Sequence, residues 1–279
     1  MSRYQNGRIT TQLMYPNINS GIGAVIARAM VQHASSGKVF IVGKAGLAGL
    51  NEAQALFPGN HEDGTRLYHT TVDSAISAAT AARGDVIIIL PGHTETVTAT
   101  SVALDISALT IIGLGNGLLR PTFTYGAAAA TVTVSAANCT WKNCHFIGNF
   151  LDIAAAFTLG AAKDFVLENN TFVDNSSALG FLSIVVTGAT DNDADGLVVR
   201  GNYWQGLDVA PNAFISILAA EKRVLIEDND VFMDSTADKG HFLTIAAKIM
   251  TGIRIRRNKL VVVGVTTATV GVFMTGSST

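Results

Sequence analysis

The sequence has few charged residues and no concentration of either sign. Asp, Glu, Lys and Arg make up 14% of the 279 residues, compared with about 25% in typical soluble domains. The net charge is −2 and no basic block occurs, so the electrostatic basis for nucleic-acid binding is missing. Hydrophobic residue types make up 48% of the chain. This composition fits either a surface that partners partly cover or strands rich in Ala and Thr.

Cysteine is also scarce, and the two present do not suggest a disulfide framework. Cys139 and Cys144 lie five positions apart on one expected strand, so their side chains are expected to face opposite sides and not to bridge. They are typical of reduced core residues in a protein assembled in a reducing cytosol. No secretory signal is expected at the N-terminus. The uncharged residues 260–279 have the Thr and Gly content of a β-turn-β terminus rather than of a membrane span.

What the sequence does contain is a short repeated phrase with an asparagine near its centre. It reads V-L-E-N-N-T-F from Val166, and related phrases begin at Leu197, Leu225 and Ile253. The repeated asparagines are Asn170, Asn202, Asn229 and Asn258, at steps of 32, 27 and 29 residues. Degenerate copies put Cys144 and Gly115 in the same slot. A period of this length indicates a solenoid, in which each repeat buries its apolar face against its neighbours.

A second, fainter repeat lies between the asparagine phrases and indicates strands. The runs A-F-T-L, F-L-S-I, F-I-S-I, F-L-T-I and V-F-M-T begin at Ala156, Phe181, Phe214, Phe242 and Val272. They alternate in polarity and are rich in β-branched and aromatic residues. Because no helix-length amphipathic run separates them, we expect a β-solenoid with at least two strands per period. Each repeated asparagine is expected at a corner with left-handed backbone angles, stacked in a side-chain amide ladder.

Residues 71–97, T-V-D-S-A-I-S-A-A-T-A-A-R-G-D-V-I-I-I-L-P-G-H-T-E-T-V, predict a helix followed by a buried strand. Thr70 is expected to cap the helix, with Asp73 three residues on. Gly84 is expected to end it. One apolar helical face consists of Val72, Ala75, Ile76 and Ala79. The apolar run 86–90 is typical of a strand buried on both sides.

This segment resembles the opening of a right-handed parallel β-helix of the pectate-lyase-like kind. In that family a helix caps the first coil and a Gly-Asp, a buried strand and a Pro-Gly turn follow. The run L-T-I-I-G-L-G-N-G-L-L-R-P-T-F from Leu109 resembles β-helix proteins of tailed-phage virions. The resemblance covers about residues 65–275. It implies an all-β, single-stranded, right-handed parallel β-helix of about seven coils with an N-terminal capping helix. Because this fold hosts many unrelated functions, it does not by itself imply an activity.

We expect three segments along the chain. Residues 1–37 form an N-terminal arm that matches no coil, residues 38–70 hold a strand, a short helix and a loop, and residues 71–279 form the β-helix. The arm carries apolar residues that predict ordering against a partner. These residues are Tyr4, Leu13, Tyr15, Ile22, Val25 and Met30.

The best local motif for a ligand is the loop T-D-N-D-A-D-G at residues 190–196. Asp191, Asp193 and Asp195 match the first half of a calcium loop, since Ca²⁺ prefers several hard oxygen ligands. The twelfth position is Asn202 rather than Glu. Two interpretations therefore stay open, a calcium site and a solvated turn, and no other cofactor is indicated.

Catalytic machinery is sparse. Gly240-His241 and Arg254-Ile255-Arg256 resemble elements of polygalacturonases, but the clustered aspartates of that family are missing, and glycoside hydrolysis needs paired carboxylates. His93 is expected at a surface or corner. A row of charges shares one repeat slot and fits either a lyase-like site or cross-coil pairing. The row consists of Glu168, Arg200, Glu227 and Arg256.

These features predict a non-enzymatic virion structural protein of a tailed phage, assembled in the host cytoplasm. The specific expectation is a capsid decoration or stabilising protein that forms homo-oligomers, with a trimer favoured, on the major capsid protein or another virion protein. Neither nucleic acid nor a membrane is expected as a partner. The alternative is a tailspike-like or polysaccharide-lyase-like carbohydrate-active protein, or a glycan-binding β-helix without catalysis.

Overall fold

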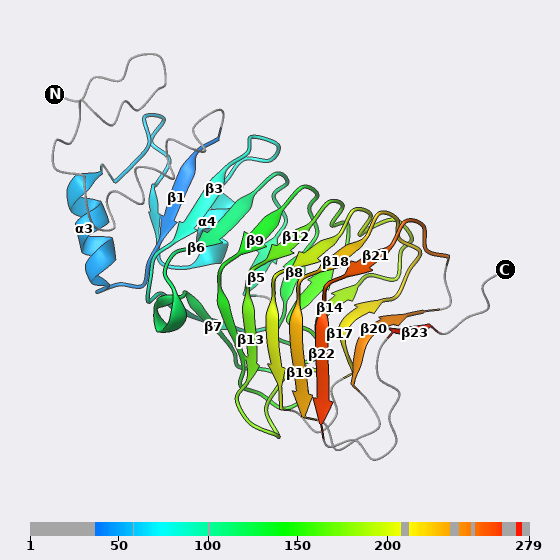
Figure 1. Cartoon of the computed structure of the whole chain (residues 1–279). Coiled ribbons are helices and arrows are strands. Elements are labelled where there is room, and N and C mark those ends of the chain that lie inside the picture. Colours follow the sequence, from blue (N-terminus) through cyan, green and yellow to red (C-terminus); the bar gives the residue numbers. More distant parts are fainter. Residues whose placement is uncertain are drawn as a thin grey trace.

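Three parallel β-sheets wind around one core in this protein (Figure 1). The computed structural model describes residues 37–57, 59–99, 101–207, 212–234, 240–246 and 249–263, and the backbone of 272–274. Seven successive turns with three strands each run from β3 to β23, and β1 begins a further turn before them. The predicted all-β parallel β-helix is therefore confirmed.

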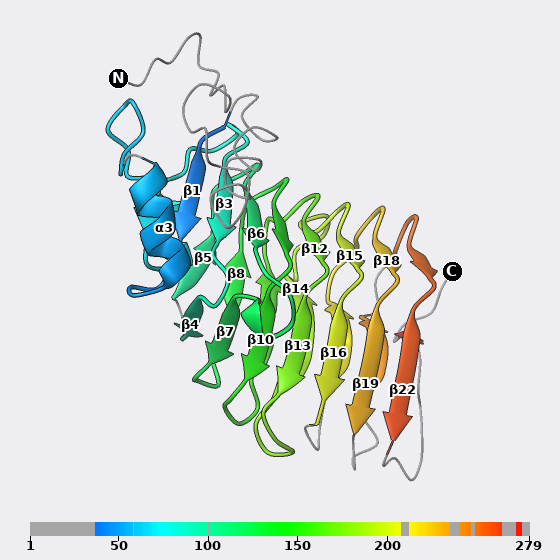
Figure 2. The ribbon, with the colours of Figure 1, turned by 60° about the vertical axis from the view of Figure 1, so that its left-hand side comes forward.

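Each turn contributes one strand to each sheet, and all neighbouring strands in the sheets pair in parallel. Sheet 1 consists, in spatial order, of β2 (Tyr68–His69), β1 (Val39–Val42), β3 (Val86–Ile89), β6 (Thr110–Gly113), β9 (Thr140–Lys142), β12 (Val166–Glu168), β15 (Val198–Arg200), β18 (Leu225–Glu227) and β21 (Arg254–Arg256). Sheet 2 consists of β4 (Thr94–Val97), β7 (Thr122–Tyr125), β10 (His145–Gly148), β13 (Thr171–Asp174), β16 (Tyr203–Gly206), β19 (Asp230–Asp234) and β22 (Lys259–Val263), side by side in Figure 2. Sheet 3 consists of β5 (Val102–Leu104), β8 (Val132–Val134), β11 (Phe157–Leu159), β14 (Ser183–Thr187), β17 (Ala213–Ile217), β20 (His241–Ile245) and β23 (Val272–Met274).

The two sequence repeats correspond to defined parts of each turn. The asparagine phrases form the corner between sheets 1 and 2, and the fainter repeat lies at sheet 3. Two registers differ from the repeat as written. Leu243 rather than Phe242 pairs with Val272, a shift of one residue. Phe157 pairs with Val185 rather than with a residue of the phrase that begins at Phe181. The reason is that β14 begins only at Ser183, while Phe181 makes an isolated bridge to Ile153.

The capping helix α4 (Val72–Ala78) covers the N-terminal end of the core, as expected. Its cap is Thr71 rather than Thr70, since the Thr71 hydroxyl accepts a hydrogen bond from the N–H of Ser74 at 3.3 Å. The helix also ends earlier than predicted, with Ala79 as its C-cap. Gly84, with φ of 77°, lies in the turn before β3 instead.

Strand β3 is buried on both faces, which explains its continuous apolar sequence. Ile87 and Ile89 belong to the main core, while Val86 and Ile88 pack in a second cluster with Leu50 of helix α3 (Ala48–Leu56). Besides α3 and α4, the described chain has the short 3₁₀ helix η1 (Gly117–Leu119), at the corner between β6 and β7. No helix in the described part of the chain is long and apolar enough to cross a membrane.

Aromatic side chains stack along the core beneath sheet 2. Phe123, Phe146 and Phe172 are in register on β7, β10 and β13. Their ring centroids lie 5.4 Å and 4.9 Å apart, with nearly parallel planes in both pairs. Each of these three turns therefore adds one ring to a continuous column.

Cys139 and Cys144 are free and fully buried, as expected of reduced core residues. The expectation that their side chains face opposite sides of one strand is wrong, because a corner follows β9 and separates them. Burial raises the pKa of Cys144 to about 12, which keeps it a thiol. His93 lies at the corner between β3 and β4, one of the two places expected for it, but it is buried, and its Nε2 lies 3.2 Å from Glu95 Oε2.

Candidate functional site

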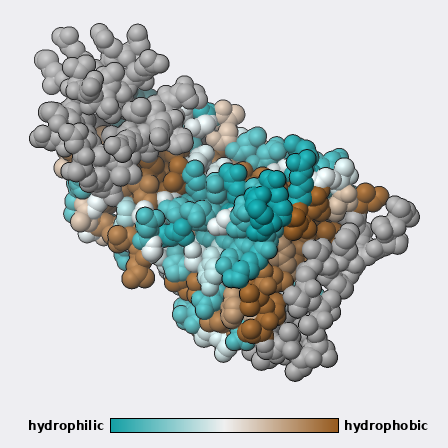
Figure 3. All heavy atoms as spheres, in the orientation of Figure 1, coloured by the Kyte–Doolittle hydropathy of each residue, from teal (hydrophilic) through white to brown (hydrophobic). Residues whose placement is uncertain are grey.

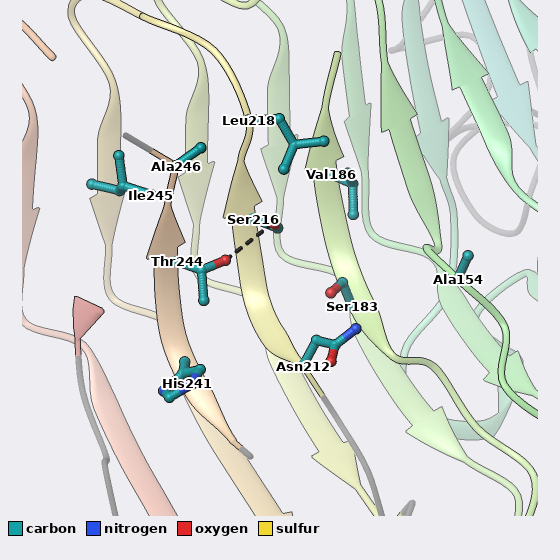
Figure 4. A pocket seen from close by; sticks show the side chains of 10 residues that line it. All are labelled: Ala154, Ser183, Val186, Asn212, Ser216, Leu218, His241, Thr244, Ile245 and Ala246. Carbon is teal, nitrogen blue, oxygen red and sulfur yellow. Dashed lines mark hydrogen bonds between the residues drawn. The ribbon is translucent and has the colours of Figure 1, made fainter. Parts of the chain in front are cut away.

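A groove of about 470 Å³ lies on the outer face of sheet 3, across β14, β17 and β20. The lining side chains are shown in Figure 4. They are Ala154, Ser183, Val186, Asn212, Ser216, Leu218, His241, Thr244, Ile245 and Ala246. None of these residues is acidic, lysine or arginine, so the groove offers neutral polar groups on a largely aliphatic surface.

The groove arises where the inward–outward alternation of the strands is interrupted. In each of the three strands two successive residues belong to the core, for example Phe214 and Ile215 in β17. In a regular strand, residues three positions apart face opposite sides of the sheet. The extra inward residue therefore brings Ser183 and Val186, three positions apart, to the same groove. A local irregularity of this kind re-aims side chains, as β-bulges do.

Two hydroxyl groups form the polar centre of the groove. Ser216 and Thr244 are in register on β17 and β20. The Thr244 Oγ1 and Ser216 Oγ atoms lie 3.1 Å apart, the contact drawn as a dashed line in Figure 4. Asn212 and His241 lie at the start of the same two strands and add an amide and an imidazole to the lining. Together these groups can donate and accept several hydrogen bonds.

The four repeated asparagines are stacked at the corner between sheets 1 and 2. The Asn202 Oδ1 atom accepts from the Asn170 backbone N–H at 2.9 Å and from its Nδ2 at 3.2 Å. The same pair of bonds links Asn202 to Asn229, at 3.0 and 3.1 Å, and Asn229 to Asn258, at 3.0 and 2.9 Å. Asn170, Asn202 and Asn229 are buried. The corner is therefore a structural ladder without access for a ligand.

The expectation that these asparagines adopt left-handed backbone angles is wrong. The left-handed position is the residue before each ladder residue. These preceding residues are Asn143, Asn169, Gly201, Asp228 and Arg257, with φ from 53° to 63°. The preceding residue makes the sharp turn of the backbone, and the side chain of the ladder asparagine extends along the axis of the β-helix to a neighbouring turn.

Gly115 does not occupy the ladder slot that the repeat assigned to it. Residue Thr122 pairs with His145, so Pro121 stands opposite Cys144. The inserted residues around η1 separate Gly115 from that position. Cys144 does occupy the slot, and its backbone N–H donates to Asn170 Oδ1 at 2.9 Å.

The predicted row of charges lies on the outer face of sheet 1. Pairing in register places Glu168 opposite Arg200, Arg200 opposite Glu227, and Glu227 opposite Arg256. The Arg200 Nε to Glu168 Oε1 distance is 3.2 Å and the Arg256 Nε to Glu227 Oε2 distance is 2.6 Å. Hydrophilic residues cover this part of the face in Figure 3. The side chains of this row form ion pairs between neighbouring turns, so the row does not form a convergent acid–base centre.

In the loop with alternating aspartates, two carboxylates bind backbone groups of the following turn. Asp191 Oδ1 accepts from the N–H of Ala220 at 2.9 Å, and Asp195 Oδ1 accepts from the N–H of Lys222 at 2.8 Å. Among the described residues, no group of three or more His, Cys, Asp or Glu side chains is placed to hold a metal ion. Asp193 and Asp195 contribute instead to the environment of Glu221.

Glu221 is a buried carboxyl that the sequence did not single out. Its Oε2 accepts from the N–H of Ala194 at 3.0 Å. Burial raises its pKa to about 7, and the neighbouring negative charges of Asp195 and Asp193 add to this shift. No sequence pattern marks this group, because a Glu in a polar turn is normally exposed.

The remaining predicted contact residues lie outside the described part of the chain. They are Tyr4, Leu13, Tyr15, Ile22, Val25 and Met30. Of the groove residues, His241 was noted from its Gly-His context. The Ser and Thr of the fainter repeat were visible in F-I-S-I and F-L-T-I, but their meeting on one outer face depends on the pairing register.

No family model matches the sequence, and no curated protein matches it. Among solved structures, the chain is similar to an alginate lyase from Paenibacillus sp. str. FPU-7 at 12% identity. The match covers 70% of this chain and 96% of that chain, with a TM-score of 0.26. Values this low carry no argument about activity.

Proposed function

We propose that this protein is a non-catalytic binding β-helix that holds a neutral carbohydrate in the groove on sheet 3. The observation that supports the proposal is the groove itself, about 470 Å³ in volume and lined by hydroxyl, amide, imidazole and aliphatic groups. Ligand sites in proteins commonly have volumes of about 300–1,000 Å³ and a few polar groups on an apolar lining.

The chemistry of the lining favours a hydroxyl-rich ligand. Ser216, Thr244 and Asn212 can each both donate and accept a hydrogen bond, which matches the hydroxyl groups of a sugar. Because no Lys or Arg is among the described residues that line the groove, these residues offer no countercharge for a uronate carboxylate. A neutral oligosaccharide is therefore the favoured ligand class.

The same lining argues against glycoside hydrolysis, which uses two carboxylates on either side of the scissile bond. His241 is the sole titratable side chain among the described lining residues. Proton abstraction by one base, without groups that stabilise the developing negative charge, gives only part of the acceleration that enzymes reach.

Calorimetric titration with neutral oligosaccharides tests the proposal, with uronate oligomers of equal length for comparison. The double substitution Ser216→Ala and Thr244→Val removes two hydrogen-bonding groups and should weaken binding by about tenfold. The matched control is Thr133→Val, an exposed threonine on the same outward-facing row but outside the groove. Absence of neutral-sugar binding by the unaltered protein, or equal binding by the double variant, would overturn the assignment.

A second measurement addresses catalysis directly. The purified protein should release neither reducing ends nor unsaturated sugars from capsule, lipopolysaccharide or pectin. Turnover that disappears in His241→Ala, with oligosaccharide binding retained, would make the groove an active site.

The predicted virion role, with a capsid partner and a homotrimer, stays a prediction. A structural role is a second candidate, and one feature of the described chain favours it. The N-terminal end of the core is covered by α4, whereas Ile255 in the last turn of sheet 1 is 40% exposed.

A further inference from the structure

We propose that the last turn, residues 251–263, is an interaction surface for an extended acidic segment of a partner protein, which adds as one more parallel turn. In the topology of the described chain, β21 ends sheet 1 and β22 ends sheet 2. Strands at such an edge present backbone groups that can pair with a further strand. The partner is distinct from the ligand of the groove on sheet 3.

The charge of this turn is one-sided. It carries four cations, Arg254, Arg256, Arg257 and Lys259, and no acidic residue. The preceding turn supplies acidic partners for three of them. Arg256 and Arg257 bind Glu227, Arg257 also binds Asp228, and Lys259 Nζ lies 3.3 Å from Asp230 Oδ2. Arg254 makes no ion pair with any described residue.

The alternation of positive and negative side chains along sheet 1 indicates the charge that would suit a further turn. The row in register reads Lys142, Glu168, Arg200, Glu227 and Arg256. It therefore ends on a cation, and the next position in the same row would be matched by a carboxylate. The side chains of Arg256, Arg257 and Lys259 are 52%, 57% and 67% exposed, so they can contact a second anion.

The asparagine ladder also has a direction, and it points toward the last described turn. In each step the backbone N–H of one asparagine donates to the side-chain oxygen of the next. No described asparagine follows Asn258, so an incoming turn with an amide or carboxylate oxygen at this slot would continue the ladder. Apolar groups complete the surface, since Ile255 and Val263 are 40% and 39% exposed. Figure 3 shows a hydrophobic band near this end, over β19 and β22.

These features favour a protein strand over a polyanion. A nucleic acid or sulfated glycan would satisfy the cations but neither the strand edges nor the exposed apolar residues. A suitable probe is a synthetic peptide with the sequence of residues 224–234, V-L-I-E-D-N-D-V-F-M-D. Within the fold this sequence already pairs with β21 and β22 in the required register, on their other edge.

Fluorescence anisotropy with the full chain provides the test. The peptide should bind, and binding should weaken as salt is raised. A version with Lys in place of its first three acids should bind about tenfold more weakly or worse. The substitution Arg254→Glu should weaken binding without disturbing the internal ion pairs, while Lys44→Glu, an exposed cation near the N-terminal end, should have no effect.

Three outcomes would overturn the proposal. They are absence of binding, equal binding of the acidic and Lys peptides, and equal binding of a scrambled peptide of the same composition. The last outcome would identify a general anion-binding surface instead. Thermal unfolding of Arg254→Glu, measured by circular dichroism, separates lost binding from lost folding.

Discussion

At the scale of single residues, the asparagine ladder links buried polar groups of successive turns through several hydrogen bonds each. Asn229 donates through Nδ2 to the carbonyl of Val199 at 2.9 Å and to Asn258 Oδ1, and accepts two bonds from Asn202. A buried donor or acceptor that loses its partner has no water to replace it. The resulting loss of folding free energy is therefore larger than the net contribution of the hydrogen bond itself.

Asn229→Leu should therefore destabilise the fold by about 2–4 kcal/mol, because the N–H of Asn202 and the carbonyl of Val199 are left without partners. Asn258→Leu is the matched comparison at the less buried end of the ladder, where no described asparagine accepts a hydrogen bond from the Asn258 backbone N–H. It should have a smaller effect. Urea titration of both variants checks the order, and equal midpoints would contradict a gradient along the ladder.

Glu221 should make the stability of the protein depend on pH. Its pKa in the folded protein is about 7, raised from 4.5, so the folded state binds more protons than the unfolded state between these values. Its stabilising contribution is full below about pH 4.5 and falls away as pH rises through 7. Glu221→Gln should remove this decline and raise the melting temperature at pH 8 relative to the unaltered protein, with little difference at pH 4.5.

The control for this experiment is Glu62→Gln, an exposed glutamate near the N-terminal end. It should leave the pH dependence of the melting temperature as it is in the unaltered protein. A Glu221→Gln variant with the same decline between pH 5 and 8 would show that another group causes it.

At the scale of elements, the strands of sheet 2 direct some aromatic side chains into the core and others to the outer face. Phe146 faces the core and packs between Phe123 and Phe172. Phe232, on β19 of the same sheet, faces outward and is partly exposed. The alternation of period two makes this division.

Phe146→Ala should destabilise the protein by about 3–5 kcal/mol, because it opens a cavity in the aromatic column that its neighbours cannot fill. Phe232→Ala removes the same side chain from the outer face and should change stability by less than about 1.5 kcal/mol. Chemical denaturation of the pair measures the difference. Similar losses in both variants would mean that the outer face of sheet 2 is also covered.

The elements that could be predicted from sequence were those marked by local pattern. The V-L-E-N-N-T-F phrases predicted the corners, and the apolar run at β3 predicted a doubly buried strand. The shift of β14 relative to the phrase at Phe181 could not be predicted, since parallel pairing depends on residues about 30 positions away. The groove on sheet 3 was missed for the same reason: Ser183, Ser216 and Thr244 are unremarkable until register and a broken alternation bring them together.

At the scale of the whole molecule, the two ends of the β-helix differ in their chemistry. The first turn is closed by α4, and the Asp85 carboxylate there binds the N–H groups of Lys38 and Thr80 and the side chain of Arg83. Burial opposes the charge of Asp85, but these hydrogen bonds outweigh it and lower its pKa. The charged residues of the last described turn, 251–263, are all cations, and Ile255 and Val263 there are partly exposed.

Assembly through the N-terminal arm can be separated from assembly through the last turn. Deleting residues 1–36 removes none of the described strands, since β1 begins at Val39. The truncated protein should keep its melting temperature within a few degrees. It should lose self-association or particle binding if the apolar residues of the arm, Leu13 and Tyr15 among them, make the predicted contacts with a partner. Light scattering measures the self-association, and co-sedimentation with particles measures the particle binding. If the truncated protein assembles as well as the full chain and Arg254→Glu does not, the contact lies at the last turn.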